Sequence, residues 1–278
     1  ILFSSNYFLI SYVQEARVFI FFCLTSLCFI NSYLIIRETG FELKVPNLLF
    51  LFIFSLILLS SFIFSFVLIG SLFFYEFFFE KKNKKYFAIN GVVFLSIIIS
   101  IFLNIEFYKS ILNFEAVSIS NQTINFYIFN YFFKQFFGSK IMGFLFILFF
   151  LISIIYLIKN RNKDKKLIFL FLIVFFSYSV PITYGYLFSP VLQDKYIIYV
   201  IPIVLIFISY AISKIHNFKL KISMFVFLIL VSTINQSLKN FKKEIDKPEF
   251  EKILKEVNLI DESNFYASSF MDNNNNLY

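Results

Sequence analysis

The sequence is poor in charged residues and in the residue types that build turns and catalytic sites. Only 15% of its 278 residues are charged and 59% are hydrophobic, with six Gly, five Pro, two Cys, one His and no Trp. With a mean hydropathy of +0.80, the chain has too little polar surface to cover a water-soluble globule of this size. The composition excludes an ordinary soluble domain and indicates a membrane protein.

The scarcity of histidine and cysteine excludes several kinds of site. His216 is the only histidine and lies in a basic loop, so histidine-based catalysis and a multi-histidine metal site are excluded. Cys23 and Cys28 are five positions apart in one apolar run, about 140° around a helix, so they share no face for a metal or a redox pair. We therefore assign no metal ligand.

The net charge of +8 has a different origin from the charge of a nucleic-acid-binding domain. Its lysines and arginines occur in short clusters between apolar runs, which is the positive-inside pattern of membrane proteins. We expect membrane lipids, and no nucleic acid, as partners.

Apolar runs between the charge clusters predict the membrane spans. A span needs about 20 apolar residues, and the runs lie at 16–36, 46–79, 86–105, 141–158, 167–184, 196–212 and 222–238. A continuous helix over 46–79 would be about 51 Å long at 1.5 Å per residue, which is too long for the bilayer core. We therefore split this run near Ser60 and Ser61 into two short helices, which gives eight spans.

The basic clusters orient these spans. The loop from Lys159 to Lys166 is the clearest basic loop and should be cytoplasmic. Counting from it places three further loops on the same side: 37–44, 80–85 and 214–221. Glu15, the loop 106–140, the loop 185–195 and the tail then face outward. A single helix over 46–79 would instead move Glu15 to the cytoplasmic side, and length favours the split.

Two outward regions carry further predictions. The loop 106–140 is rich in Phe and Tyr and predicts an interfacial amphipathic helix, which either rests at the headgroups or guides a lipid-borne substrate. After Leu238 the composition becomes polar, so we divide the chain into a multi-span domain (1–238) and the start of an outward domain (239–278). In this tail a helix is predicted from Asp246 to about Val257 and a strand at 264–270. The expected fold class is an all-α polytopic membrane protein with the start of an extracytoplasmic α/β tail.

Charges at span ends are the candidates for function, because burying a charge without a partner costs several kcal/mol. Glu15 and Arg17 lie at the outer end of the first predicted span, and Lys195 lies at the outer end of the seventh. Glu76 and Glu80 lie beside Lys81 and Lys82, and for these we expect interfacial ion pairs within that cluster.

Three segments carry a family resemblance. Residues 4–22 read SSNYFLISYVQEARVFIFF, and the matching positions are Ser11, Tyr12, Gln14, Glu15, Ala16, Arg17 and, in place of the usual Tyr, Phe19. Residues 189–212 match at Pro190, Tyr196 and Pro202, with Lys195 in place of the usual Arg. Residues 247–254, KPEFEKIL, follow the last apolar run. In order and spacing the segments resemble the polytopic GT-C glycosyltransferases of glycosyltransferase family 39, which includes protein mannosyltransferases and aminoarabinose transferases.

The resemblance implies transfer of a sugar from a polyprenyl-phosphate donor to a lipid, glycan or protein acceptor, on the outer face of a bacterial inner membrane. Such a site needs cations to stabilise the departing phosphate. Arg17 and Lys195 are the candidates for this contact, with Tyr196 and Tyr199 near the same edge and Glu15 as a positioning partner for Arg17. Two structural alternatives stay open: Arg17 pairs with Glu15, and Lys195 extends to the headgroups from a helix end. Lys195 also lacks the planar fork of Arg.

The catalytic base stays unassigned. The resemblance implies an Asp in the first outward loop, and we expect that loop upstream of Ile1, in a longer protein of which this chain is the middle and the end. The resemblance implies no fixed cofactor, although some relatives bind a divalent metal near the donor phosphate.

Two other classes of protein are the alternatives. A polyprenyl-linked O-antigen polymerase or ligase should have paired arginines in its large outward loop, and 106–140 has none. A transporter should have repeated halves and helices broken by Gly or Pro, whereas Pro181 and Pro202 fall near the ends of predicted helices. The glycosyltransferase is the favoured interpretation.

Overall fold

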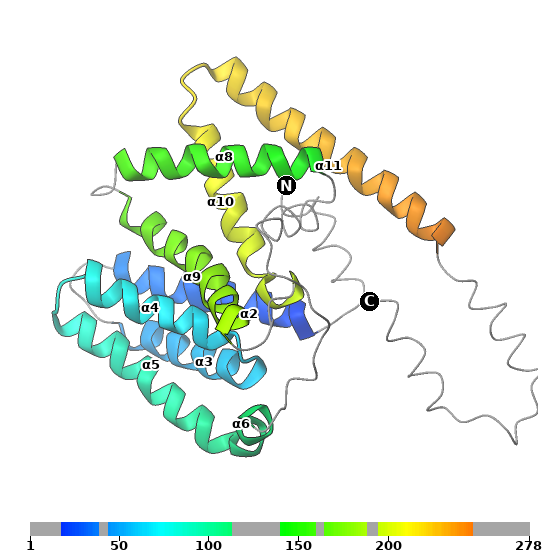
Figure 1. Cartoon of the computed structure of the whole chain (residues 1–278). Coiled ribbons are helices and arrows are strands. Elements are labelled where there is room, and N and C mark those ends of the chain that lie inside the picture. Colours follow the sequence, from blue (N-terminus) through cyan, green and yellow to red (C-terminus); the bar gives the residue numbers. More distant parts are fainter. Residues whose placement is uncertain (1–17, 39–43, 113–139, 160–163, 188–193, 247–278) are drawn as a thin grey trace, which may run out of the picture. The chain divides into compact units, whose positions relative to one another are not determined.

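The computed structural model describes residues 18–38, 44–112, 140–159, 164–187 and 194–246, and every regular element in these ranges is helical (Figure 1). The chain divides into two units, Ile1–Gln236 and Ser237–Tyr278. The elements are α2 (Val18–Glu38), α3 (Val45–Ser61), α4 (Ser65–Phe79), α5 (Lys84–Leu103), α6 (Ile105–Leu112), α8 (Lys140–Lys159), α9 (Lys165–Leu187), the 3-10 helix η1 (Asp194–Ile197), α10 (Val200–Ser213) and α11 (Phe218–Asp246).

The long apolar run after Lys44 forms two helices, which confirms the predicted split near Ser60 and Ser61. Helix α3 ends at Ser61 because Phe62 adopts an extended backbone (φ −160°, ψ 138°). A tight turn follows, in which the amide of Ser65 donates to the carbonyl of Phe62 (3.1 Å). The length limit of the bilayer therefore identified a break that neither proline nor glycine marks.

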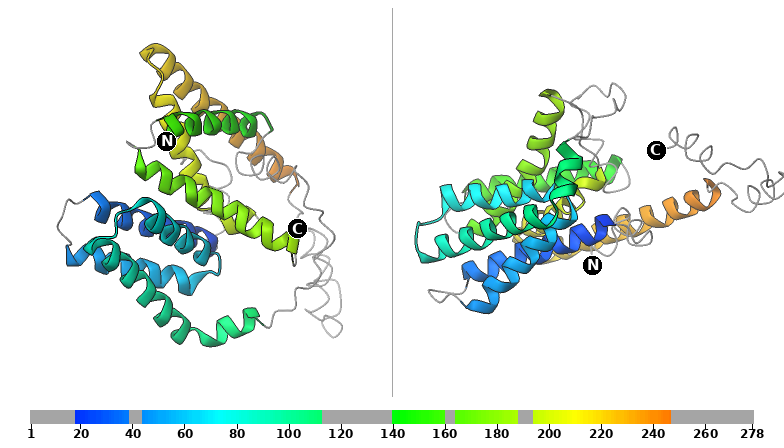
Figure 2. Two further views of the ribbon diagram at one scale, coloured as in Figure 1. Left: turned by 60° about the vertical axis from the view of Figure 1, so that its left-hand side comes forward. Right: turned by 90° about the horizontal axis from the view of Figure 1, so that it is seen from below.

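The first helices of the chain pack side by side, with α3 antiparallel to α2 and parallel to α5. Helix α3 lies against both α2 and α5, and α4 lies against α9, as Figures 1 and 2 show. A buried pair of serines crosses the α3–α5 contact, where Ser55 Oγ donates to Ser96 Oγ (2.7 Å). Small hydroxyl residues of this kind let membrane helices approach closely and bond across the contact.

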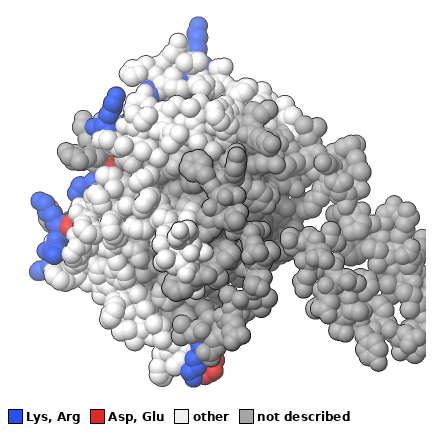
Figure 3. All heavy atoms as spheres, viewed as in Figure 1, with Lys and Arg blue, Asp and Glu red and all other residues white. Residues whose placement is uncertain are grey.

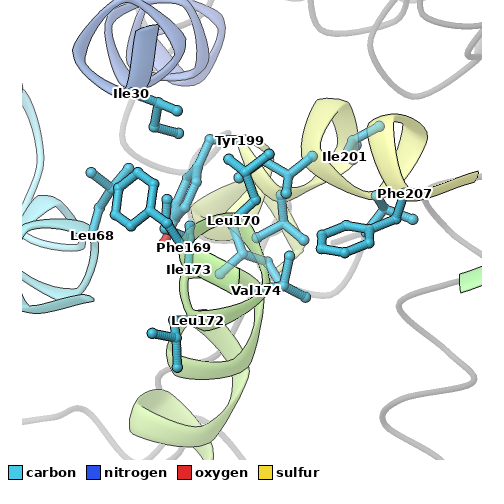
Figure 4. Close-up of a cluster of buried hydrophobic side chains, with 14 of the residues drawn as sticks. Ile30, Leu68, Phe169, Leu170, Leu172, Ile173, Val174, Tyr199, Ile201 and Phe207 are labelled. Atoms are coloured by element: carbon cyan, nitrogen blue, oxygen red, sulfur yellow. The ribbon is translucent and has the colours of Figure 1, made fainter. Parts of the chain in front are cut away.

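Helices α9 and α10 supply much of the core. Figure 4 shows side chains of α9, among them Phe169 and Ile173, between Leu68 of α4 and the residues around Tyr199. Pro181 lies inside α9, which continues to Leu187. This differs from the expected place near a helix end, and membrane helices tolerate such prolines because neighbouring groups satisfy the freed carbonyl.

The outer surfaces of the helices are apolar. Within the described ranges, four helices are long and apolar enough to cross a membrane: Phe19–Glu38, Lys84–Leu103, Met142–Lys159 and Lys165–Leu187. Three shorter apolar helices, α3, α4 and α10, accompany them. Large side chains such as Phe94 and Phe102 of α5 are exposed, as is expected where lipid is the solvent. The chain thus has the build of an integral membrane protein, with an all-helical fold over the described ranges.

Several sequence predictions fall partly outside these ranges. Helix α6 opens the predicted interfacial loop, and the rest of that loop, from 113 to 139, lies outside the described residues, as do the predicted helix and strand of the tail. Helix α11 continues beyond the predicted domain boundary at Leu238 to Asp246. The α/β tail remains a prediction.

Candidate functional site

Within the described residues of the first unit, an aromatic cluster and a charged cluster lie at opposite ends of α2. Helix α2 connects them, because its first turns reach one end and Tyr33 and Arg37 reach the other. We call the region around Phe19, Phe62, Phe64 and Tyr196 the aromatic end. We call the region where α2 and α4 end and α5 and α9 begin the basic end.

The predicted substrate-binding residues belong to the aromatic end where they can be placed. Glu15 and Arg17 precede the described residues, and of Lys195 only the backbone, in η1, is described. Tyr196 lies among three rings, with centroid distances of 5.9 Å to Phe19, 5.2 Å to Phe62 and 5.3 Å to Phe64. The contact with Phe19 brings together two of the three segments that carry the family resemblance, which are far apart in the sequence.

Tyr199 is buried inside the helical unit. Its ring meets Phe22 edge-on at 5.2 Å, and its hydroxyl lies 2.7 Å from the hydroxyl of Ser177 in α9. The side chain is fully buried. This geometry suits a residue that joins η1 and α10 to α2 and α9 better than one that touches a ligand directly.

The basic end holds a buried carboxylate, Glu76, which is fully shielded from solvent. Tyr33 donates its hydroxyl hydrogen to Glu76 Oε1 (2.5 Å), and Arg37 Nε donates to the same oxygen (2.8 Å). Arg37 Nη2 pairs with the second oxygen, Oε2. The guanidinium thus binds the carboxylate through two parallel contacts. This bidentate geometry gives the strongest ion pairs between these groups.

A second carboxylate extends this cluster toward α9. Glu80 Oε2 lies 3.6 Å from Arg37 Nη1, and Glu80 Oε1 accepts a hydrogen bond from the Tyr75 hydroxyl (3.1 Å). Lys165 Nζ approaches the same oxygen at 4.0 Å. The end of α4 is therefore tied to both α2 and α9 by charge.

The sequence interpretation of these two glutamates needs a correction. Ion pairing was expected with Lys81 and Lys82, but Glu76 and Glu80 pair with Arg37, which is 39 positions from Glu76. Glu76 faces α2 from inside α4, whereas Lys81 and Lys82 lie beyond the end of that helix and are exposed. The available signal was a single acidic residue within an otherwise apolar helix, which requires a buried cation as partner.

The Glu76 cluster suits a structural role. Its two carboxylate oxygens together accept three hydrogen bonds from Tyr33 and Arg37, so little capacity remains for a substrate. Among the described ranges no group of three or more His, Cys, Asp or Glu could hold a metal ion. A shallow depression between α2 and α3, lined by Phe21, Leu56, Ile57, Ser60 and Ser61, also lacks a titratable side chain.

Of the predicted site residues, the structure therefore places the side chains of Tyr196 and Tyr199, and both lie near the start of α2. Comparison of the chain with protein-family models, with curated proteins and with solved structures gives no match.

Proposed function

We propose that this chain is part of a membrane glycosyltransferase that moves a sugar from a polyprenyl-phosphate donor to a lipid, glycan or protein acceptor. The contact between Phe19 and Tyr196 (5.9 Å) is the observation that carries the proposal. It joins two of the three sequence segments whose likeness to GT-C glycosyltransferases suggested the function.

The proposal assigns the donor phosphate to the aromatic end. Arg17 is two positions before Phe19, and Lys195 directly precedes Tyr196, so the ring contact supports placing both cations near one ligand. Two cations at the departing phosphate would stabilise the negative charge that grows there during transfer. Glu15 would orient Arg17, Tyr196 would line the approach, and Tyr199 would hold η1 and α10 against α2 and α9.

The proposed topology has eight spans: α2, α3, α4, α5, α8, α9, α10 and α11. Helices α3, α4 and α10 have 17, 15 and 14 residues, about 20 to 26 Å at 1.5 Å per residue. They are shorter than a typical hydrocarbon core, which local thinning of the bilayer accommodates at modest cost. Alternation of the spans then puts the basic end in the cytoplasm and the aromatic end outside.

The test is sugar transfer by membranes that contain the full-length protein. Membranes are supplied with polyprenyl-phosphate-linked hexoses and pentoses, and transfer of labelled sugar to the lipid, glycan and protein fractions is counted. We expect Arg17→Ala to lower turnover at least about tenfold, because a charge-assisted contact is worth about 1.5 to 3 kcal/mol.

Lys109→Ala provides the matched control. This lysine lies in α6 on the proposed outer side and is exposed, with its ion pair to Glu106 also at the surface, so its loss should leave turnover unchanged. Absence of transfer from every donor would refute the proposed function. Transfer that is equally fast in the Arg17→Ala variant would refute the role of Arg17.

A further inference from the structure

The link between α4 and α5, together with the first residue of α5, presents three lysines, Lys81, Lys82 and Lys84, which we call the basic loop. All three are exposed. Among the residues that the structure describes, none of their ammonium groups has a carboxylate within 4.0 Å. Nearby Lys166, in contrast, pairs with Glu38. Three exposed cations thus have no carboxylate partner among the described residues.

Both sides of the basic loop are fixed. Glu80, at the end of α4, is held by Arg37 and Tyr75. Asn83 caps α5 by accepting a hydrogen bond from the amide of Tyr86 (3.0 Å), and Lys85 Nζ donates to the carbonyl of Ile36 in the last turn of α2 (3.1 Å). The intervening lysines are therefore presented on a short, anchored link, which reduces the entropy lost when they bind a ligand.

Exposed aromatic rings accompany these lysines. Phe77 and Phe78 in the last turn of α4 are 54% and 62% exposed, and Lys82 Nζ lies 4.9 Å from the centre of the Phe77 ring. Figure 3 shows Lys and Arg side chains gathered along the edge of the molecule where α4 and α5 connect. Apolar rings directly next to unpaired cations fit the boundary between acyl chains and headgroups.

We propose that the basic loop is a binding site for the headgroups of anionic phospholipids. The phosphate would lie against Lys81, Lys82 and Lys84, while Phe77 and Phe78 contact the upper part of the acyl chains. Each lysine near an anionic membrane surface adds to the attraction for anionic lipid, so three lysines together give a measurable preference over zwitterionic lipid. This site is independent of the proposed sugar transfer.

The segment 214–221, which comprises the link between α10 and α11 and the first turn of α11, provides a matched control, because it also has three lysines. Lys214 and Lys221 are half-buried there, and Lys214 lies 4.6 Å from the centre of the Tyr210 ring. Replacing the lysines of this segment by glutamine removes the same charge as the corresponding change in the basic loop. A general effect of positive charge would therefore reduce lipid binding equally in both variants.

The experiment measures lipid retained by the purified full-length protein. Protein in detergent is titrated with mixed micelles of phosphatidylglycerol and phosphatidylcholine, and bound lipid is counted by native mass spectrometry. We expect phosphatidylglycerol to bind preferentially, and K81Q/K82Q/K84Q to weaken that binding at least about tenfold. The variants K214Q/K219Q/K221Q and K81R/K82R/K84R should bind as the wild type does.

Three results would overturn the proposal. One is equal binding of the two lipids by the wild type, and another is equal weakening in the two glutamine variants. The third is displacement of phosphatidylglycerol by inorganic phosphate alone, which would identify a site for free phosphate instead of a lipid headgroup. Retention in an excess of inorganic phosphate supports the headgroup site.

Discussion

The two ends of the first unit are held together by different forces. At the basic end, Arg37 and Glu76 join α2 to α4 through a buried ion pair, and Glu80 extends the cluster to α9. At the aromatic end, rings from α2, the α3–α4 link and η1 meet around Tyr196. Paired charges thus join the helices at the basic end, whereas aromatic rings supply the contacts at the other end.

The lysines at the basic end are of two kinds: some interact with groups of the protein, and others extend outward. Lys85 and Lys165 interact with groups of the protein, the first with the carbonyl of Ile36 and the second with Glu80. Lys81, Lys82 and Lys84 extend outward from the same short region. Pairing, and not position in the sequence, distinguishes lysines that hold helices together from those available to lipid.

The largest expected effect is a difference in cysteine labelling between the two ends, because in the proposed topology they lie on opposite sides of the membrane. In a background with Cys23→Ala and Cys28→Ala, we expect Asn83→Cys to react with a membrane-impermeant maleimide only from the cytoplasmic side. Ile63→Cys, in the link between α3 and α4, should react only from outside, because one helix lies between the two sites. Labelling of intact and opened cells measures this. Reaction of both cysteines from one side would contradict the proposed topology.

The next largest effect should come from the buried ion pair. Glu76→Leu removes the acceptor for Tyr33 and leaves Arg37 without its main partner, which should lower the free energy of unfolding by about 3 to 5 kcal/mol. Titration of the purified protein with sodium dodecyl sulfate in mixed micelles measures the change.

The double variant Arg37→Leu with Glu76→Leu shows whether the single variant loses stability because the ion pair is broken or because the side chains pack less well. Leucines in both positions leave no uncompensated buried charge from the pair, so most of the lost stability should return. A double variant no more stable than Glu76→Leu alone would mean that the pair does not account for the effect.

Much of the helical architecture was predictable from hydropathy. The run over 46–79 exceeds the bilayer in length, and this limit alone placed the break that the structure has after Ser61. Helix ends were less predictable: α10 begins at Val200, after the separate 3-10 helix η1, although the apolar run begins at Tyr196. Hydropathy measures which residues prefer lipid, and it does not detect a change in backbone geometry within an apolar segment.

Polar contacts within the membrane were not predictable in the same way. Glu76 was correctly expected to form an ion pair, but the nearest lysines in the sequence were the wrong partners. Its partner Arg37 approaches only because α2 and α4 are brought together, which depends on packing between helices. Tyr199 illustrates the same limit, since only the fold shows that its hydroxyl meets Ser177 in α9.

The smallest expected effect is on stability, and it tests how much a buried hydrogen bond stabilises the protein near the aromatic end. Tyr199→Phe removes the hydroxyl contact with Ser177 but keeps the ring against Phe22. Ser177 retains its bond to the carbonyl of Ile173 (2.6 Å), so the loss should be only about 1 kcal/mol. The same detergent titration measures it.

Tyr186→Phe is the control for this change, because Tyr186 is 81% exposed at the end of α9 and its hydroxyl is available to solvent. We expect no measurable change in stability there. If Tyr199→Phe lowers the free energy of unfolding as much as Glu76→Leu does, then hydrogen bonding stabilises the aromatic end as much as ion pairing stabilises the basic end. A small loss means instead that the hydroxyl contact with Ser177 adds little to stability and that the ring contact with Phe22, which the variant keeps, is enough to hold this position.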